Sequence, residues 1–134
     1  MQSLHTRALM SASAAFMGIL GIAASFFSHE ILAFVGATVE TQTVLIVQVL
    51  GALYLGFAFL NWYLRGFAMG GIYNRPVGLG NTLHFAIVSV TLIKAASALD
   101  SIAIWLVLAA YVVFAVWFGL VLFVSPPAIR NDTD

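Results

Sequence analysis

Four long apolar runs constrain the fold of this chain of 134 residues more than any other feature. They cover approximately residues 8–27, 42–64, 76–98 and 101–124. A helix needs about 20 mostly apolar residues to cross a bilayer, because lipid offers no hydrogen-bond partner to an unpaired backbone group. Each run is therefore predicted to be a membrane-spanning helix.

The composition and the short links between the runs support the same prediction. Hydrophobic residues make up 63% of the chain and charged residues 7%, whereas a soluble protein is about half apolar and about a quarter charged. The runs lack the alternation of polar and apolar residues that marks the strands of a membrane β-barrel. We predict an all-α membrane protein, a single transmembrane domain over residues 1–134 that forms an antiparallel four-helix bundle.

The first run could also be a signal peptide, because Arg7 precedes it and small residues lie near Ala24 and Ser25. Its apolar stretch is longer than the usual span of about 7 to 15 residues in such peptides. We therefore favour a retained membrane span.

The few charges divide unevenly between the two sides of the predicted membrane. One side carries the cations Arg7, Arg65, Arg75 and Arg130. The other side carries Lys94 with the acids Glu30, Glu40 and Asp100. Because cytoplasmic loops carry an excess of Lys and Arg, this bias predicts a multi-pass protein of the inner (plasma) membrane with both termini in the cytoplasm.

Several kinds of site are disfavoured by what the chain lacks. It has no cysteine and a formal net charge of zero, which excludes thiol chemistry and gives no reason to expect a nucleic acid partner. His84 is the only histidine in a predicted span, and no second ligand lies one helical turn away to complete a metal site. No span holds a carboxylate, which weakens acid–base catalysis and proton-coupled export. We predict no metal site, and the sequence points to no particular cofactor.

Spacings of three and four residues place chosen side chains on common helix faces. Small residues in the first run form a predicted packing face: Ser11, Ala14, Ala15, Gly18, Gly21, Ala24 and Ser25. A small and polar face of the second run should look into the bundle: Gly51, Tyr54, Ala58, Asn61 and Arg65. In the third run the same spacing places the polar groups along one side: Asn81, His84, Val88, Thr91 and Ala95.

Local signals predict two helix positions in the links. Asn74 can cap the third span, and Pro76 suits a first helical turn, where no backbone donor is lost. Apolar side chains in the link of residues 28–41 predict a short helix lying at the membrane surface. Asp100, followed by Ser101, is predicted to cap the fourth span.

The segment "RGFAMGGIYNRPVGLGN", residues 65–81, is unusually rich in glycine, arginine and asparagine for a link between two spans. It brings together the predicted ligand-binding residues Asn61, Arg65, Arg75, Asn81 and His84 at the cytoplasmic mouth of the bundle. Arginines beside a helix N-terminus suit a phosphate or carboxylate, so an amphiphile could bind with its head there. Alternatively, the arginines only set the topology and the amides hydrogen-bond between helices.

Residues 48–94 also resemble a family of small uncharacterised bacterial four-helix membrane proteins. The resemblance is carried by "QVLGALYLGFAFLNW", "GGIYNRPVGLGN", "HF" at His84 and "LIK" ending at Lys94. That family is similar in size and topology to DoxX-like proteins, some of which are associated with quinone-linked oxidation. The resemblance implies a four-helix membrane architecture and assigns no catalytic residue.

The sequence leaves three hypotheses about function. The first is a non-enzymatic membrane protein that binds a membrane lipid or other lipophilic small molecule, or that supports a larger membrane complex. The second is a membrane enzyme or redox subunit that acts on a quinone-like substrate, with His84 transferring a proton and Arg75 holding an anionic head. The third is a small transporter acting as a homodimer.

Overall fold

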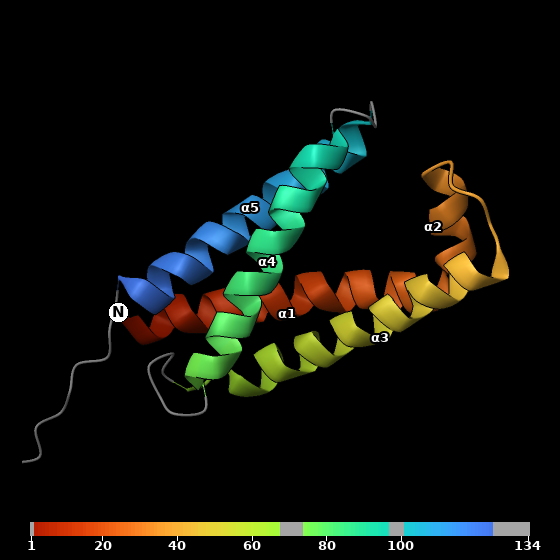
Figure 1. Ribbon diagram of the computed structural model, residues 1–134. Coiled ribbons are helices and arrows are strands. Elements are labelled where there is room, and N and C mark those ends of the chain that lie inside the picture. The colour runs from red at the N-terminus through yellow and green to blue at the C-terminus, as the bar shows by residue number, and fades with distance from the viewer. Residues whose placement is uncertain (1, 68–73, 97–100, 125–134) are drawn as a thin grey trace, which may run out of the picture. The chain divides into compact units, whose positions relative to one another are not determined.

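The structure, a computed structural model, describes residues 2–67, 74–96 and 101–124. In these residues all regular secondary structure is helical. The helices are α1 (Gln2–Phe26), α2 (Ser28–Phe34), α3 (Thr41–Leu64), α4 (Asn74–Ala96) and α5 (Ile102–Phe123) (Figure 1). All except α2 are long and apolar enough to cross a membrane. The predictions of an all-α fold and of four membrane-spanning helices are confirmed.

The helix boundaries agree closely with the local signals in the sequence. Helix α4 begins at Asn74, so Pro76 lies in its first turn, where its missing N–H leaves no bond unmade. A short helix, α2, occupies the link after α1. Helix α5 follows Ser101, whose backbone is extended and whose side chain makes no capping hydrogen bond. The predicted cap Asp100 lies outside the described residues.

The chain divides into two compact units, which are described separately. One unit is Met10–Arg65, which contains most of α1 together with α2 and α3. The other joins Met1–Leu9 to Gly66–Asp134 and contains α4 and α5. The prediction of a single transmembrane domain stays a prediction.

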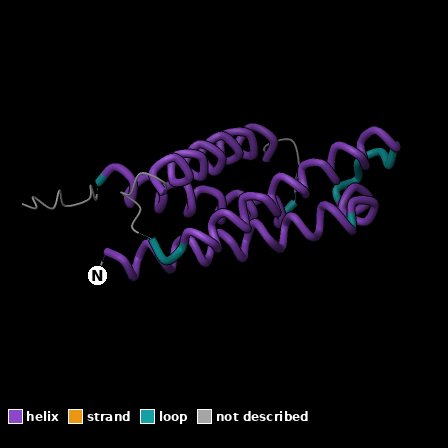
Figure 2. Tube along the Cα trace, turned by 90° about the horizontal axis from the view of Figure 1, so that it is seen from below, coloured by secondary structure: helices purple, strands orange, loops and turns teal. Residues whose placement is uncertain are grey.

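In the first unit, α1 and α3 run antiparallel and touch through their backbones (Figures 1 and 2). A methyl carbon added to Gly51 would lie only 2.7 Å from the amide nitrogen of Ser25 and 2.9 Å from the carbonyl oxygen of Gly21. Only glycine allows so close an approach, which brings Cα–H groups against carbonyl oxygens. The predicted packing face of small residues on α1 therefore contacts α3 at Gly21 and Ser25.

The interior face predicted for α3 is also the observed one. Gly51, Ala58 and Asn61 are all buried, and a methyl carbon on Gly18 would lie 3.7 Å from Cβ of Ala58. Because Tyr54 and Arg65 lie on the same face at its edge, they remain partly exposed. The spacing of three and four residues thus located this face correctly.

In the second unit, α4 and α5 form an antiparallel pair (Figure 1), and large rings pack between them. Phe85 of α4 stacks on Phe114 and Phe118 of α5, with ring centroids 4.9 and 5.6 Å away. It also lies 5.4 Å from the ring of Tyr111. Because Phe85 and Phe118 are fully buried, the rings fill the space between the two helices.

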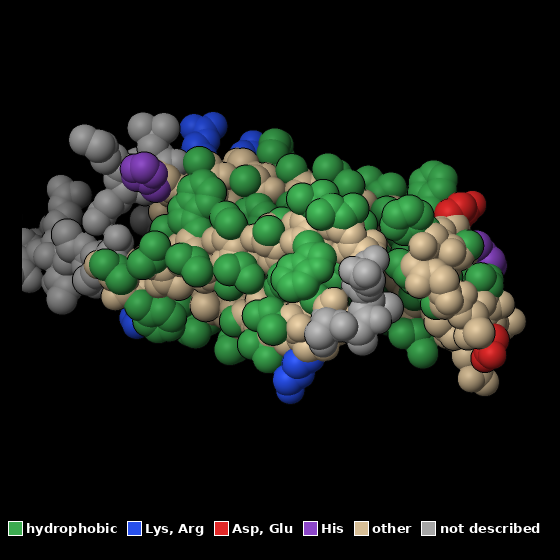
Figure 3. Space-filling model, turned by 90° about the horizontal axis from the view of Figure 1, so that it is seen from above, with side chains coloured by type: hydrophobic (Ala, Val, Ile, Leu, Met, Phe, Trp, Pro, Cys, Tyr) green, Lys and Arg blue, Asp and Glu red, His purple; other side chains and the backbone are tan. Residues whose placement is uncertain are grey.

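Large apolar side chains remain exposed on all four long helices, including Phe59 at 73% and Leu106 at 66%. Hydrophobic side chains accordingly cover much of the face seen in Figure 3. Such a surface would be unfavourable in water, whereas lipid tails are as apolar as the side chains themselves. The exterior therefore suits a multi-pass membrane protein.

Candidate functional site

The five residues predicted to bind a ligand are divided between the two units. Asn61 and Arg65 belong to Met10–Arg65, whereas Arg75, Asn81 and His84 belong to the other unit. The convergence of all five at one mouth of the bundle stays a prediction.

Arg65 folds back over the last turn of α3. Its Nη1 donates a hydrogen bond of 2.6 Å to the carbonyl oxygen of Trp62, and its Cζ lies 3.5 Å from the centroid of the Trp62 ring. The last carbonyls of a helix lack partners within the helix and carry partial negative charge, so a guanidinium there is favourable. The indole face adds a cation–π contact. The planar cation is thus held in one orientation at the end of a membrane span.

Asn61 is fully buried, one turn before Arg65, and joins α3 to α1. Its Nδ2 donates to Oγ of Ser13 at 3.1 Å and lies 3.8 Å from Sδ of Met17. Ser13 in turn donates to the carbonyl oxygen of Met10 at 3.1 Å. A polar side chain in lipid needs such partners, because an unmade hydrogen bond there is costly. For Asn61 the contacts support the alternative that the amides hydrogen-bond between helices.

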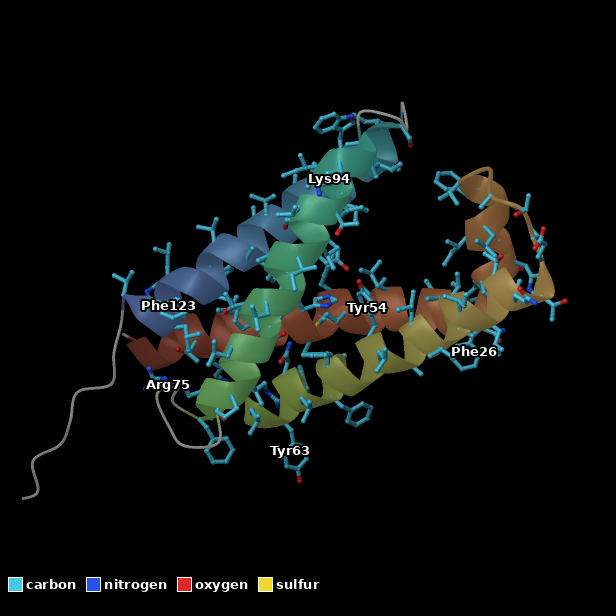
Figure 4. All side chains as sticks on the ribbon, in the orientation of Figure 1. Phe26, Tyr54, Tyr63, Arg75, Lys94 and Phe123 are labelled. Carbon is cyan, nitrogen blue, oxygen red and sulfur yellow. The ribbon has the colours of Figure 1, made fainter. Side chains whose placement is uncertain are left out.

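Two of the predicted residues on α4 occupy contrasting surroundings. Arg75 lies exposed in the first helical turn (Figure 4). Asn81 is fully buried, and its Nδ2 donates to the carbonyl oxygen of Val77 in its own helix at 2.9 Å. Arg75 is therefore accessible to an anion, whereas the amide of Asn81 already serves its own backbone.

His84, the remaining candidate, lies beside the aromatic rings between α4 and α5. Its ring centroid is 5.3 Å from that of Phe85 and 5.9 Å from that of Tyr111. The side chain is half-buried. An imidazole on α4 and a phenol on α5 therefore lie side by side between two neighbouring spans.

Beyond Asn81, the most buried side of α4 differs from the side on which its polar groups are spaced. The buried residues are Asn74, Gly78, Asn81, Phe85, Ser89 and Ala96. Thr91 is exposed and donates to the carbonyl oxygen of Ile87. Both His84 and Phe85 are at a helical spacing from Asn81, three and four residues away. Phe85 is the one that is fully buried, because its larger ring fills the space against α5.

Sequence reasoning missed two groups of partners. Ser13 and Met17 were not singled out as partners for Asn61, although a buried amide in the second span required a donor or acceptor on another helix. Phe85, Phe114 and Phe118 were not recognised as a cluster. The spacing of Tyr111, Phe114 and Phe118 by three and four residues was the available signal.

The two arginines of the predicted site lie in different units, and no cluster of metal-ligand residues is found in the described parts of the chain. Among the described residues, no three His, Cys, Asp or Glu side chains lie close enough together to hold a metal ion. Arg65 and Arg75 provide the guanidinium groups, one in each unit, that could pair with a phosphate or carboxylate. No family model matches this chain, and no curated protein or solved structure matches it either. The resemblance to DoxX-like proteins therefore stays a prediction.

Proposed function

We propose that this chain is a non-enzymatic multi-pass protein of the inner membrane, with both termini in the cytoplasm, that binds the anionic head of a lipid at the end of α3. The observation that carries the proposal is the guanidinium of Arg65, which is held flat against Trp62. It forms no ion pair with a carboxylate in the described parts of the chain and uses one N–H for the carbonyl of Trp62. Its other N–H groups are positioned for an external anion.

The surroundings of Arg65 suit a lipid better than a soluble anion. Trp62 and Tyr63 are exposed at the same end of α3, and Figure 4 shows Tyr63 pointing away from the helix. Such rings prefer the level of the lipid headgroups. Phe59 and Leu60 are exposed one turn deeper, where an acyl chain would run. A guanidinium pairs with a phosphodiester through two parallel hydrogen bonds.

The test compares an anionic with a zwitterionic lipid. Delipidated protein in uncharged detergent is titrated with phosphatidylglycerol or phosphatidylcholine, and the increase in melting temperature is measured. We expect phosphatidylglycerol to give the larger increase, because a ligand that binds the folded state stabilises it. Arg65→Ala should weaken binding about tenfold or more, since hydrogen bonds to charged groups are worth about 1.5–3 kcal/mol. Arg65→Lys should restore part of the effect, because it keeps the charge without the planar fork.

The increase on adding lipid is the relevant quantity, because Arg65→Ala also removes the contact with Trp62 and changes the melting temperature by itself. Lys94→Ala is the matched control, since Lys94 is likewise an exposed cation near the C-terminal end of a span (Figure 4). Arg75→Ala tests separately whether the second guanidinium contributes. Equal lipid responses in wild type and Arg65→Ala, with no lipid retained in native mass spectra, would contradict the proposal.

A second candidate function is favoured by the pairing of His84 with Tyr111. The imidazole of His84 on α4, beside the phenol of Tyr111 on α5, could move a proton to or from a quinone-like substrate. Turnover of a soluble quinone analogue that is lost in His84→Ala and retained in Arg65→Ala would favour this membrane enzyme over the lipid-binding protein. Absence of turnover and of any visible absorption from a bound cofactor would exclude it.

A further inference from the structure

Helix α2 lies crosswise to the two spans that it connects. Figure 1 shows its axis across the ends of α1 and α3, and Figure 2 views it nearly end-on while those helices run lengthwise. All three belong to the same unit. Since α1 and α3 have the length of membrane spans, a helix that lies across them runs along the plane of the bilayer.

Specific contacts hold α2 in this orientation. Ser28 is buried and accepts a hydrogen bond of 3.4 Å from Nε2 of Gln48 on α3, and Leu32 is buried as well. At the other end, Gly36 has a φ of +70°, and the amide of Ala37 donates to the carbonyl oxygen of Leu32 at 2.9 Å. Together with the bond from Gly36 to Ala33, this is a Schellman motif, which ends the helix sharply.

The side chains of α2 divide into three sides. Ser28 and Leu32 face the protein. Ile31 and Phe34, three residues apart, share a second side, where Phe34 is 77% exposed. Phe27 is the N-cap residue just before α2 and is exposed as well. His29 lies on a third side and is exposed, and Glu30, four residues before Phe34, is exposed at the border of the second side.

Large apolar side chains are also exposed on the span that precedes α2. Ile22 and Phe26, in the last turns of α1, are exposed as well, and Figure 4 shows Phe26 pointing away from the helix. Acidic side chains gather at the same end of the unit in Figure 3; the exposed acids there are Glu30 and Glu40. Apolar rings beside charges at the end of a span match the boundary between acyl chains and headgroups.

We propose that α2 is an interfacial anchor, which inserts Phe27 and Phe34 into the leaflet at the end of α1 and keeps His29 and Glu30 in the headgroup region. Its partner is the lipid surface, because α2 lies crosswise to two candidate membrane spans and the side chains of Ile22 and Phe26, at the adjoining end of α1, are apolar and exposed as well. Burying a phenylalanine side chain is worth about 1.5–3 kcal/mol. The two rings can therefore fix the depth of the α1–α3 pair in the membrane.

The absence of cysteine from the chain makes depth measurements straightforward. Phe34→Cys, His29→Cys and Ile46→Cys are each labelled with a nitroxide and reconstituted in phosphatidylcholine liposomes. Collisions with oxygen and with a water-soluble nickel complex are compared by electron paramagnetic resonance. Ile46 is exposed in the second turn of α3 and marks the depth within that span.

We expect the label at position 34 to collide with nickel several-fold less often than the label at position 29, and to lie nearer the surface than the label at position 46. Phe27→Cys should behave like Phe34→Cys, which protects the test against the misfolding of one variant. Equal nickel accessibility at positions 29 and 34 would overturn the proposal and point to a partner protein on α2. Arg65 lies at the opposite end of α3, so either result leaves the lipid-head proposal unaffected.

Discussion

The two units of this protein pack membrane-spanning helices in opposite ways. Helices α1 and α3 meet through Gly21 and Gly51, where the backbones are so close that a single methyl group would collide with main-chain atoms. Helices α4 and α5 are instead separated by stacked rings around Phe85. One interface depends on the absence of side chains, and the other depends on their bulk.

This difference shows how helices can associate without a hydrophobic driving force between them. Lipid is as apolar as a protein interior, so association depends on close packing and on hydrogen bonds. The α1–α3 pair gains both, because the backbone contact near Gly51 is accompanied by the bond from Asn61 to Ser13. In the α4–α5 pair the rings around Phe85 supply the packing, through dispersion and ring contacts that are individually small and collectively large.

The largest expected effect is at the centre of the ring cluster. Phe85→Ala should lower the free energy of unfolding by about 3 kcal/mol, because it leaves a cavity against the rings of α5. Reversible unfolding in mixed detergent micelles measures the loss. Phe123→Ala, which truncates a ring that is 67% exposed on α5, is the matched control and should change stability by less than about 0.5 kcal/mol.

The tryptophans allow each unit to be followed separately. Trp62 lies in the first unit, whereas Trp105 and Trp117 lie on α5 in the second. In a Trp62→Phe background, Phe85→Ala should shift the fluorescence transition of α5 to lower denaturant concentration. If Phe85→Ala and Phe123→Ala lowered the free energy of unfolding by similar amounts, the ring cluster would not be what stabilises the α4–α5 pair.

The glycine contact should give the next largest effect. Gly51→Ala forces α1 and α3 apart, because its methyl group meets the backbone of Ser25 and Gly21. Overpacking of this kind costs about 1–3 kcal/mol. Gly56→Ala on the same helix is the control, since a methyl group there meets nothing within 4 Å. Gly56→Ala should leave the free energy of unfolding unchanged or raise it by up to about 1 kcal/mol, because alanine favours a helix more than glycine does.

The positions of the helices were predictable because a helix needs about 20 mostly apolar residues to cross the bilayer. The lengths of the apolar runs located all four spans, and Asn74 with Pro76 marked the start of α4. The face of α3 was also predictable, because small and polar side chains repeat along it. The face of α4 was not, because Asn81 is compatible with either His84 or Phe85 on the next turn. The choice depends on which rings α5 presents, which spacing along one helix cannot reveal.

The sequence indicated which residue types to consider for a site, namely arginines and amides near the span ends. It did not indicate which of these side chains bind to other parts of the protein. Arginines at span ends indicated anion binding, and the position of Arg65 over Trp62 keeps that hypothesis open. Asn61 and Asn81 looked equally available in the sequence. In the structure, Asn61 bonds to α1 and Asn81 to its own helix. A polar residue in a span signals a hydrogen bond, and only the fold shows whether a ligand or another helix supplies the partner.

The smallest effect, and the most specific test of the contrast between the units, is the bond between Asn61 and Ser13. In a double-mutant cycle with Asn61→Ala and Ser13→Ala, we expect a coupling energy of about 0.6 kcal/mol, and no more than about 1.7 kcal/mol, as for other hydrogen bonds between membrane helices. The single change Ser13→Ala also removes the bond to the carbonyl oxygen of Met10, and the cycle cancels that contribution. Ser89→Ala, paired with Asn61→Ala, is the matched control, because Ser89 bonds only within its own helix, to the carbonyl oxygen of Phe85. Its coupling should be zero within error. A coupling as small for Ser13 as for Ser89 would mean that Asn61 does not bind α1 to α3, and that the glycine contact alone distinguishes this pair from the ring-packed one.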